Sequence, residues 1–326
     1  MIVAHLDAAS LGRVRFAPSP VFEALSWLRL TAAGQRHPVF GDPGASARFA
    51  LRDPDVALVT DVVPASGRFT PDFLTPKAPA GRSSRIFENQ LDSIRETPDG
   101  EIARELDDEP FGGGRLPAPA RRAVESGTFA RRAANGLLRF WKQSVSERWG
   151  PISSALAADV SRRSETMSAH GVGAALRSLH PGMHWDGKVL RIEGRCEVCS
   201  RFADAELVLT PTAFAWPTMY LQLCRTDDAS VFYPADGIGT AVGAARTYAM
   251  PKLMGATRAR LLRDLSQPRS TAELSTRHRL APATVSYHLG VLLDAGLVVR
   301  ARHRRVVLYR CSEQAQALLG EPATAS

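Results

Sequence analysis

The chain has 326 residues, of which 44% are hydrophobic and 23% charged, a composition typical of a globular protein long enough for two domains. Its net charge is +8, and four cysteines are too few for the disulfide framework of a small secreted protein. The first residues lack a basic segment followed by an apolar run, which argues against a signal peptide. The longest uncharged stretch, residues 207–224, contains prolines and polar side chains, so it is not expected to span a bilayer. We therefore expect a cytoplasmic protein without a membrane segment.

Hydrophobic spacing in the N-terminal third predicts helices separated by loops. Apolar side chains repeat at helical spacing in residues 20–33 and again in residues 84–97. Residues 45–62 mix short helical patterns with a proline break, whereas residues 66–83 are rich in proline and predict a loop. Acidic residues, a triple glycine and further prolines in residues 107–119 predict a mobile connection on the surface.

The middle of the chain changes from a helical to a strand pattern. Residues 138–160 and 172–179 carry apolar side chains at a spacing of three and four, which predicts helices. Asp186 and Gly187 stand between two short apolar runs, which is the pattern of a β-hairpin. Further strands are predicted over residues 206–210, 219–223 and 231–233, and a helix over residues 239–250. The region before the C-terminal domain is thus predicted to be mostly helical, with a small antiparallel sheet.

Two motifs in this region could carry chemistry. Cys196 and Cys199 have the spacing of two zinc ligands, but structural zinc needs four, and the chain has no second such pair. A reversible disulfide and a pair of packed thiols are the alternatives. The glycines at positions 237, 239 and 243 miss the dinucleotide fingerprint by one residue, so no nucleotide cofactor is expected. The chain also lacks a Gly-x-Ser-x-Gly nucleophile motif, and we expect it not to be an enzyme.

Aromatic side chains gather around the proposed sheet. A hydrophobic core explains them, and an apolar pocket for a small-molecule effector at the edge of the sheet is the alternative. The six residues are Trp185, Phe214, Trp216, Tyr220, Phe232 and Tyr233.

The C-terminal region carries the pattern of a winged helix-turn-helix. Apolar residues predict a first helix over residues 257–265. Ser270 and Glu273 have the spacing of a capping box at the start of a second helix. A third helix begins at Pro282 and ends before Gly296, the residue type that typically terminates a helix. The alternating tail that follows predicts a β-hairpin, and two helices followed by a hairpin make a winged helix-turn-helix.

The third helix and the charge of this region indicate a DNA-binding surface. Val285, Leu289 and Leu292 lie on one stripe and should be buried, which leaves the first turns free to reach base edges in the major groove. Residues 257–310 hold eleven arginines and three acidic residues, which accounts for the entire basic excess of the chain. We therefore expect double-stranded DNA as the partner. The residues expected at the interface are Ser270, Thr271, Arg277, Arg279, Pro282, Ala283, Thr284, Ser286, Tyr287, His288, Arg302, His303, Arg304 and Arg305.

These segments resemble the ArsR/SmtB family of bacterial transcriptional repressors. The resemblance implies a homodimer that binds an inverted repeat and leaves it when an effector binds. A looser resemblance of residues 20–25 and 253–259 to long regulators of this type names no ligand for the upstream region. The matching runs are Arg258-Ala259-x-Leu261-Leu262, Ser270-Thr271-Ala272-Glu273-Leu274, Pro282-Ala283-Thr284-Val285-Ser286-Tyr287-His288-Leu289, Leu293-Asp294-Ala295-Gly296-Leu297-Val298 and the wing residues 302–309.

The chain departs from this family where metals are bound. Metal-sensing members carry a cysteine pair where this chain has residues 272–275 without a thiol, or Asp and His ligands in the C-terminal helix, where residues 312–319 contain no histidine. The wing tip usually has glycine, and here His303 and Arg304 occupy it. We therefore expect no bound metal and no cofactor.

The expected organisation is an α+β protein of two domains. Residues 1–250 would sense a small-molecule effector or form the dimer, and residues 251–326 would form the winged helix-turn-helix. The expected function is that of a dimeric repressor that responds to a non-metal signal. The alternative is an enzyme or a small-molecule-binding domain that carries a DNA-binding appendage.

Overall fold

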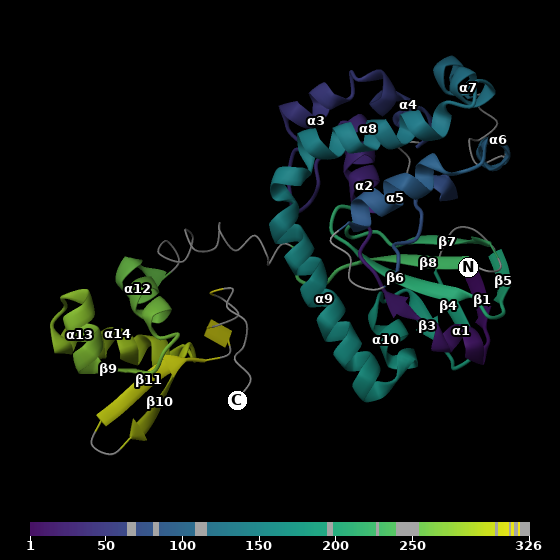
Figure 1. Cartoon of the computed structure of the whole chain (residues 1–326). Helices are drawn as coiled ribbons and strands as arrows, with labels where there is room; N and C mark the ends of the chain where they lie inside the picture. The colour runs from purple at the N-terminus through teal and green to yellow at the C-terminus, as the bar shows by residue number, and fades with distance from the viewer. Residues whose placement is uncertain are drawn as a thin grey trace. The chain divides into compact units, whose positions relative to one another are not determined.

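The computed structural model divides into two compact units, Met1–Ile238 and Gly239–Ser326 (Figure 1). It describes residues 1–63, 70–80, 85–107, 116–193, 198–225, 228–238, 254–303, 306–312, 314–315 and 319, without the side chains of 198–200, 223–225, 228 and 303. The domain boundary expected after residue 250, the helix expected over 239–250 and Cys196 all lie outside these residues. In the described part, no helix combines the length and apolar character needed to cross a membrane.

One part of the first unit is a layer of helices that share one hydrophobic core. Helix α2 lies at the centre of this layer, and the side chains of Val21, Leu25 and Leu28 are therefore almost completely buried. Ser19 starts this helix by accepting a hydrogen bond from the amide of Phe22 (3.2 Å). The helices of the layer are α2 (Pro20–Ala32), α3 (Ala45–Ala50), α4 (Pro54–Val62), α5 (Ile86–Arg95), α6 (Asp99–Asp107), α7 (Ala118–Glu125), α8 (Phe129–Ser144) and the start of α9 (Trp149–His170), with the short 3-10 helices η1 (Asp72–Leu74) and η3 (Ser146–Arg148).

These helices largely confirm the predicted ones, with two differences. Helix α2 is buried on every side rather than along one stripe, because other helices and a sheet surround it. The connection predicted over 107–119 is shorter than expected, since α6 ends at Asp107 and α7 begins at Ala118. Apolar residues are sparse in both helices, and only a few, such as Ile102 and Ala120, are buried, which explains why the sequence pattern missed them.

The mixed α and β class is confirmed, but the prediction of one small antiparallel sheet is wrong. The first unit has two four-stranded sheets, each containing parallel and antiparallel neighbours. The predicted hairpin at Asp186 and Gly187 is present, and it joins strands at one edge of the first sheet. Strand order is β3 (Met183–Trp185), β4 (Val189–Ile192), β1 (Ile2–Leu6), β5 (Val198–Phe202) in the first sheet and β2 (Arg15–Phe16), β6 (Glu206–Thr212), β8 (Asp228–Pro234), β7 (Tyr220–Arg225) in the second.

The physical reason for this error is that alternation along a strand shows which face is buried but not which strand is its neighbour. Strands β1 and β2 come from the N-terminus and enter the sheets beside strands from the far end of the unit. Strand β1 pairs in parallel with β5 and antiparallel with β4, and β2 pairs in parallel with β6, so hairpin signals in the sequence reveal none of these neighbours. Helices α1 (Ala8–Gly12) and α10 (Val172–Ser178) complete this part of the unit (Figure 1).

The second sheet is the middle layer of the unit. On β8, Val231 and Tyr233 point into a core that residues of both sheets share. Phe232, between them, points to the opposite face, where its ring stacks on Phe22 of α2 with centroids 3.8 Å apart. Because successive side chains of a strand point to opposite faces, β8 packs against the helices on one side and against the first sheet on the other.

A fully buried carboxylate fixes the helical layer to this sheet. Glu23 of α2 accepts hydrogen bonds from the backbone amides of Ala213 and Phe214, each at 2.8 Å, in the loop that follows β6. Burial raises the pKa of Glu23 to about 7, even though both backbone hydrogen bonds favour the charged form.

A second buried network fixes helix α9 to the end of β8. Asp159 accepts hydrogen bonds from Arg163 (3.1 Å), from the hydroxyl of Tyr233 (2.8 Å) and from the amide of Asp236 (3.0 Å). Arg163 also donates to the backbone carbonyl of Ser178 in α10 (2.7 Å). Burial and the nearby Asp159 raise the pKa of Tyr233, so its hydroxyl stays a donor. Each charge in this network is therefore compensated by a partner.

The raised pKa of Glu23 gives a prediction for stability. Because the folded state holds this proton more tightly than the unfolded state, the contribution of Glu23 is fully present below pH 4.5 and is lost as pH rises through 7. We expect the stability difference between the wild type and Glu23→Gln to change by about 3 kcal/mol over this interval. Urea unfolding at several pH values measures it. A difference that is constant with pH would contradict the assignment.

Candidate nucleic-acid interface

The second unit has the winged helix-turn-helix arrangement that the sequence predicts. Helices α12 (Ala256–Asp264), α13 (Thr271–His278) and α14 (Pro282–Asp294) surround a small core, and strands β10 (Val298–His303) and β11 (Val306–Cys311) form the wing. Val285, Leu289 and Leu292 are buried in this core, as their spacing predicts. A two-residue strand, β9 (Arg269–Ser270), pairs with β11. Two residues are too few for a periodic pattern, so the sequence does not predict this strand.

The predicted capping box starts helix α13. The hydroxyl of Ser270 accepts from the amide of Glu273 (3.2 Å), and the carboxylate of Glu273 accepts from the amide of Ser270 (2.7 Å). The hydroxyl of Ser270 also donates to the same carboxylate (3.0 Å). The side chain of Ser270, expected at the DNA, is thus engaged within the protein, and Thr271 beside it is half-buried.

The turn between α13 and α14 contains a strained residue. Arg279 has φ 54° and ψ 46°, the left-handed conformation that glycine usually occupies. The amide of Leu280 closes the turn on the carbonyl of Ser275 (3.1 Å). Ala281, at the N-cap of α14, offers no side-chain hydrogen bond, so Pro282 at the first helical position alone favours the start of this helix. The side chain of Arg279 is exposed, as expected for a residue that contacts DNA.

The first turns of α14 present the predicted polar face. Thr284 and Ser286 are exposed, and Tyr287 has 67% of its surface accessible. Pro282 and Ala283 are exposed as well, whereas His288 is half-buried with its ring beside that of Tyr287. The buried Nδ1 of His288 has no hydrogen-bond partner among the described residues. An exposed first half and a buried apolar stripe form the geometry with which such a helix enters a major groove.

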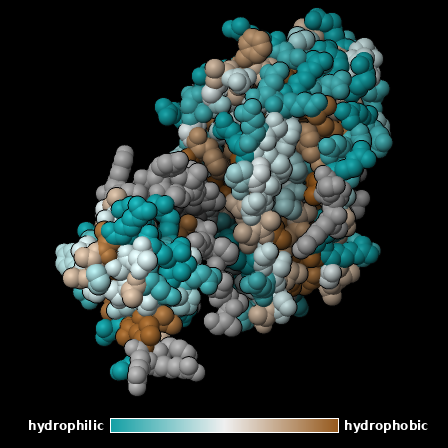
Figure 2. All heavy atoms as spheres, turned by 60° about the vertical axis from the view of Figure 1, so that its left-hand side comes forward, coloured by the Kyte–Doolittle hydropathy of each residue, from teal (hydrophilic) through white to brown (hydrophobic). Residues whose placement is uncertain are grey.

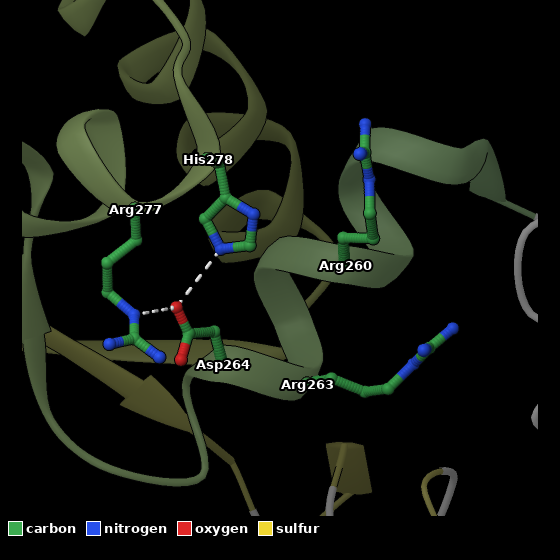
Figure 3. Close-up of a pocket in the computed structure, with 5 residues that line it drawn as sticks. All are labelled: Arg260, Arg263, Asp264, Arg277 and His278. Atoms are coloured by element: carbon green, nitrogen blue, oxygen red, sulfur yellow. Dashed lines mark hydrogen bonds and ion pairs between the residues drawn. The ribbon is translucent and has the colours of Figure 1, made fainter.

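Asp264 at the end of α12 gathers several basic side chains. Its carboxylate accepts from Arg277 (2.7 Å) and lies 3.0 Å from Nε2 of His278, both at the end of α13 (Figure 3). Arg269 of β9 completes the cluster at 3.1 Å. Partial burial alone raises the pKa of Asp264, but these basic neighbours outweigh it and hold the pKa below the ordinary value. Arg277, expected to contact DNA, is therefore paired with a carboxylate inside the unit.

Next to this cluster lies an open, basic pocket of about 460 Å³. Arg260 and Arg263 of α12 extend along it, away from the Asp264 carboxylate (Figure 3). Neither arginine has the sequence spacing of a recognised motif, so only the fold shows that they lie beside Arg277 and His278. Guanidinium groups in such an arrangement suit anionic groups such as phosphates.

The wing combines basic and apolar surface. His303 pairs with Val306 across the hairpin, which agrees with the predicted turn. Arg302 is exposed on β10, whereas Arg304, Arg305 and the side chain of His303 lie outside the described residues. Figure 2 shows hydrophobic side chains near the end of the wing, where Val306 and Val307 are 47% and 40% exposed.

The described residues include no group of three or more His, Cys, Asp or Glu side chains that could hold a metal ion. Cys196 and the side chain of Cys199 lie outside the described part, so the zinc and redox alternatives for this pair stay open. The thiol of Cys311 is buried and donates to the carbonyl of Leu262 (3.1 Å), which is a packing role.

Comparison with known proteins supports this assignment for part of the chain. Residues 254–301 match a family model described as a helix-turn-helix domain. No curated protein and no solved structure matches the chain significantly. The matched segment runs from α12 into the first strand of the wing, and it supports a DNA-binding regulator.

The strained turn gives a prediction for the stability of this unit. Replacing Arg279 by glycine should relieve the strain of the left-handed conformation. Glycine also raises the entropy of the unfolded chain, which offsets part of this gain, so we expect a net stabilisation of the unit by about 0.5–1 kcal/mol. Arg279→Ala is the matched control, because it removes the same side chain but keeps the strain. Urea unfolding of the full-length variants measures both. A glycine variant no more stable than the alanine variant would show that the turn carries no strain.

Proposed function

We propose that the chain is a sequence-specific transcriptional regulator whose helix α14 reads the major groove of DNA. The observation that carries this proposal is the exposed polar face formed by Thr284, Ser286 and Tyr287 on a helix whose opposite stripe is buried. The basic excess of the chain lies in the same unit, where it would attract and position the phosphate backbone. The match to a helix-turn-helix domain supports the same conclusion.

We further propose a dimeric repressor of the ArsR type that responds to a non-metal signal. The support is the resemblance of the α13, α14 and wing segments to that family, together with the absence of thiols in residues 272–275 and of histidine in residues 312–319. The first unit would bind the signal and would have no catalytic role.

The first test separates base reading from phosphate contact. Selection from random DNA with the purified protein identifies an operator, and binding is then titrated on operator and scrambled duplexes. Thr284→Ala and Tyr287→Ala should each weaken operator binding by about 1–3 kcal/mol per lost base contact and leave scrambled duplex nearly unchanged. Thr166→Ala, which removes the same hydroxyl from helix α9 in the other unit, is the matched control and should change neither.

A result in which the α14 variants lose both duplexes equally would assign Thr284 and Tyr287 to phosphate contacts and refute groove reading. Failure to enrich any sequence would contradict a sequence-specific regulator.

The second test concerns the oligomeric state. One winged helix buries little DNA surface, and two linked half-sites multiply the effective affinity, so we expect a homodimer on an inverted repeat. Sedimentation equilibrium at micromolar concentration should give twice the mass of one chain, and mutation of one half-site should weaken binding sharply. A monomer that binds the operator with undiminished affinity would refute the dimer.

A further inference from the structure

The first unit contains a pocket of about 400 Å³ between helix α2 and the loop that follows β6. This volume lies in the range of small-molecule sites. Its floor consists of α2 side chains, and its walls are the loop and the chain after α2. Of the six aromatic residues expected around the sheet, Phe214, Trp216 and Tyr220 meet here.

Polar side chains on the floor distinguish this pocket from a packing defect. Ser26 is only 6% exposed, and its hydroxyl has no hydrogen-bond partner among the described residues. A buried hydroxyl without a partner costs free energy, and an alanine would pack there without that cost. Because the oxygen itself is buried, the side chain of Ser26 must rotate toward the pocket to bond a ligand there, and that rotation would give the hydroxyl the partner it lacks.

Arg29 places a positive charge beside Ser26. It is 7% exposed, donates to the hydroxyl of Thr70, and holds its guanidinium carbon 5.5 Å from the centre of the Tyr220 ring. Burial lowers the pKa of Arg29, an effect that Tyr220 opposes. Arg36 adds a second cation at the exposed rim, and none of the described residues that line the pocket is acidic. The charge of the pocket thus selects an anion.

The wall opposite the floor is held in place before any ligand arrives. The Glu23 carboxylate fixes the amides of Ala213 and Phe214, and the hydroxyl of Thr212 accepts from the amide of Ala215 (3.1 Å). The amide of Thr218 closes the loop on the carbonyl of Ala215 (2.8 Å). Such preorganisation lowers the entropy lost on binding.

We propose that this pocket binds a small organic carboxylate with a flat, apolar body. Arg29 and Ser26 take the carboxylate oxygens, and Phe214, Trp216 and Tyr220 contact the body. A guanidinium with a neighbouring hydroxyl fits the two oxygens of a carboxylate, whereas a phosphate dianion needs more donors. This inference names the chemical class of the signal, and in that respect it rests on the proposed function.

Binding is tested without DNA, so its failure and the failure of the DNA-binding proposal are distinguishable. The probes are benzoate, phenylacetate, 3-phenylpropanoate and 1-naphthoate, each with its neutral amide, and phenyl phosphate. Calorimetric titration and the thermal unfolding midpoint of the full chain are measured. At least one carboxylate should bind with a Kd below about 1 mM and at least about tenfold more tightly than its amide and than phenyl phosphate.

Two serine variants separate ligand binding from packing. Ser26→Ala should weaken the bound carboxylate about tenfold and leave the unliganded protein at least as stable as the wild type. The matched control is Ser10→Ala, a buried serine whose hydroxyl accepts from the amide of Ala205 (3.0 Å). This control should lower the unfolding midpoint and keep the carboxylate affinity. Arg29→Lys, which keeps the charge but loses the planar fork, should also weaken binding.

The proposal is overturned if no carboxylate of the panel binds with a Kd below about 1 mM, a binding free energy of roughly 4 kcal/mol, or if the amides bind equally well. It is also overturned if phenyl phosphate binds more tightly than every carboxylate, or if Ser26→Ala leaves the affinity unchanged.

Discussion

The buried carboxylate of Glu23 is the interaction on which the first unit most depends. A charge without solvent is expensive, and hydrogen bonds from the amides of Ala213 and Phe214, with a further one from the side chain of Thr212, make its position tolerable. Those amides belong to the loop that ends the central strand β6, so one side chain fixes the helical layer against the sheet. Because Ser26 lies one helical turn further along α2, the same face that anchors the loop also forms the floor of the proposed ligand pocket.

Asp264 has a comparable position in the smaller unit. The unit is rich in arginine, and this one carboxylate gathers Arg269, Arg277 and His278 at the junction of α12, β9 and α13. The cluster joins the elements that support the recognition helix, while the first turns of α14 remain exposed. One carboxylate thus positions a pocket wall, and the other positions the elements that support α14, the helix proposed to read DNA.

The winged helix-turn-helix and its polar face follow from the sequence alone. The capping box of Ser270 and Glu273, the buried stripe of Val285, Leu289 and Leu292, and the hairpin all follow from spacings within a few residues. Such spacings are encoded locally, because helix and strand periods decide which side chains share a face. The high density of arginine in residues 257–310 can likewise be read directly from the sequence.

Which distant residues meet is visible only in the fold. Glu23 and Ala213 are 190 residues apart, and no periodicity connects them. The parallel pairs of β1 with β5 and of β2 with β6 escaped prediction for the same reason, as did the pairing of Arg277 with Asp264. The aromatic residues were visible as a group, but only the fold divided them between a core and a pocket. The spacing of apolar residues within a helix or strand specifies which face is buried. Which elements and side chains contact each other depends on the packing of the whole chain, because burial and charge compensation must be satisfied together.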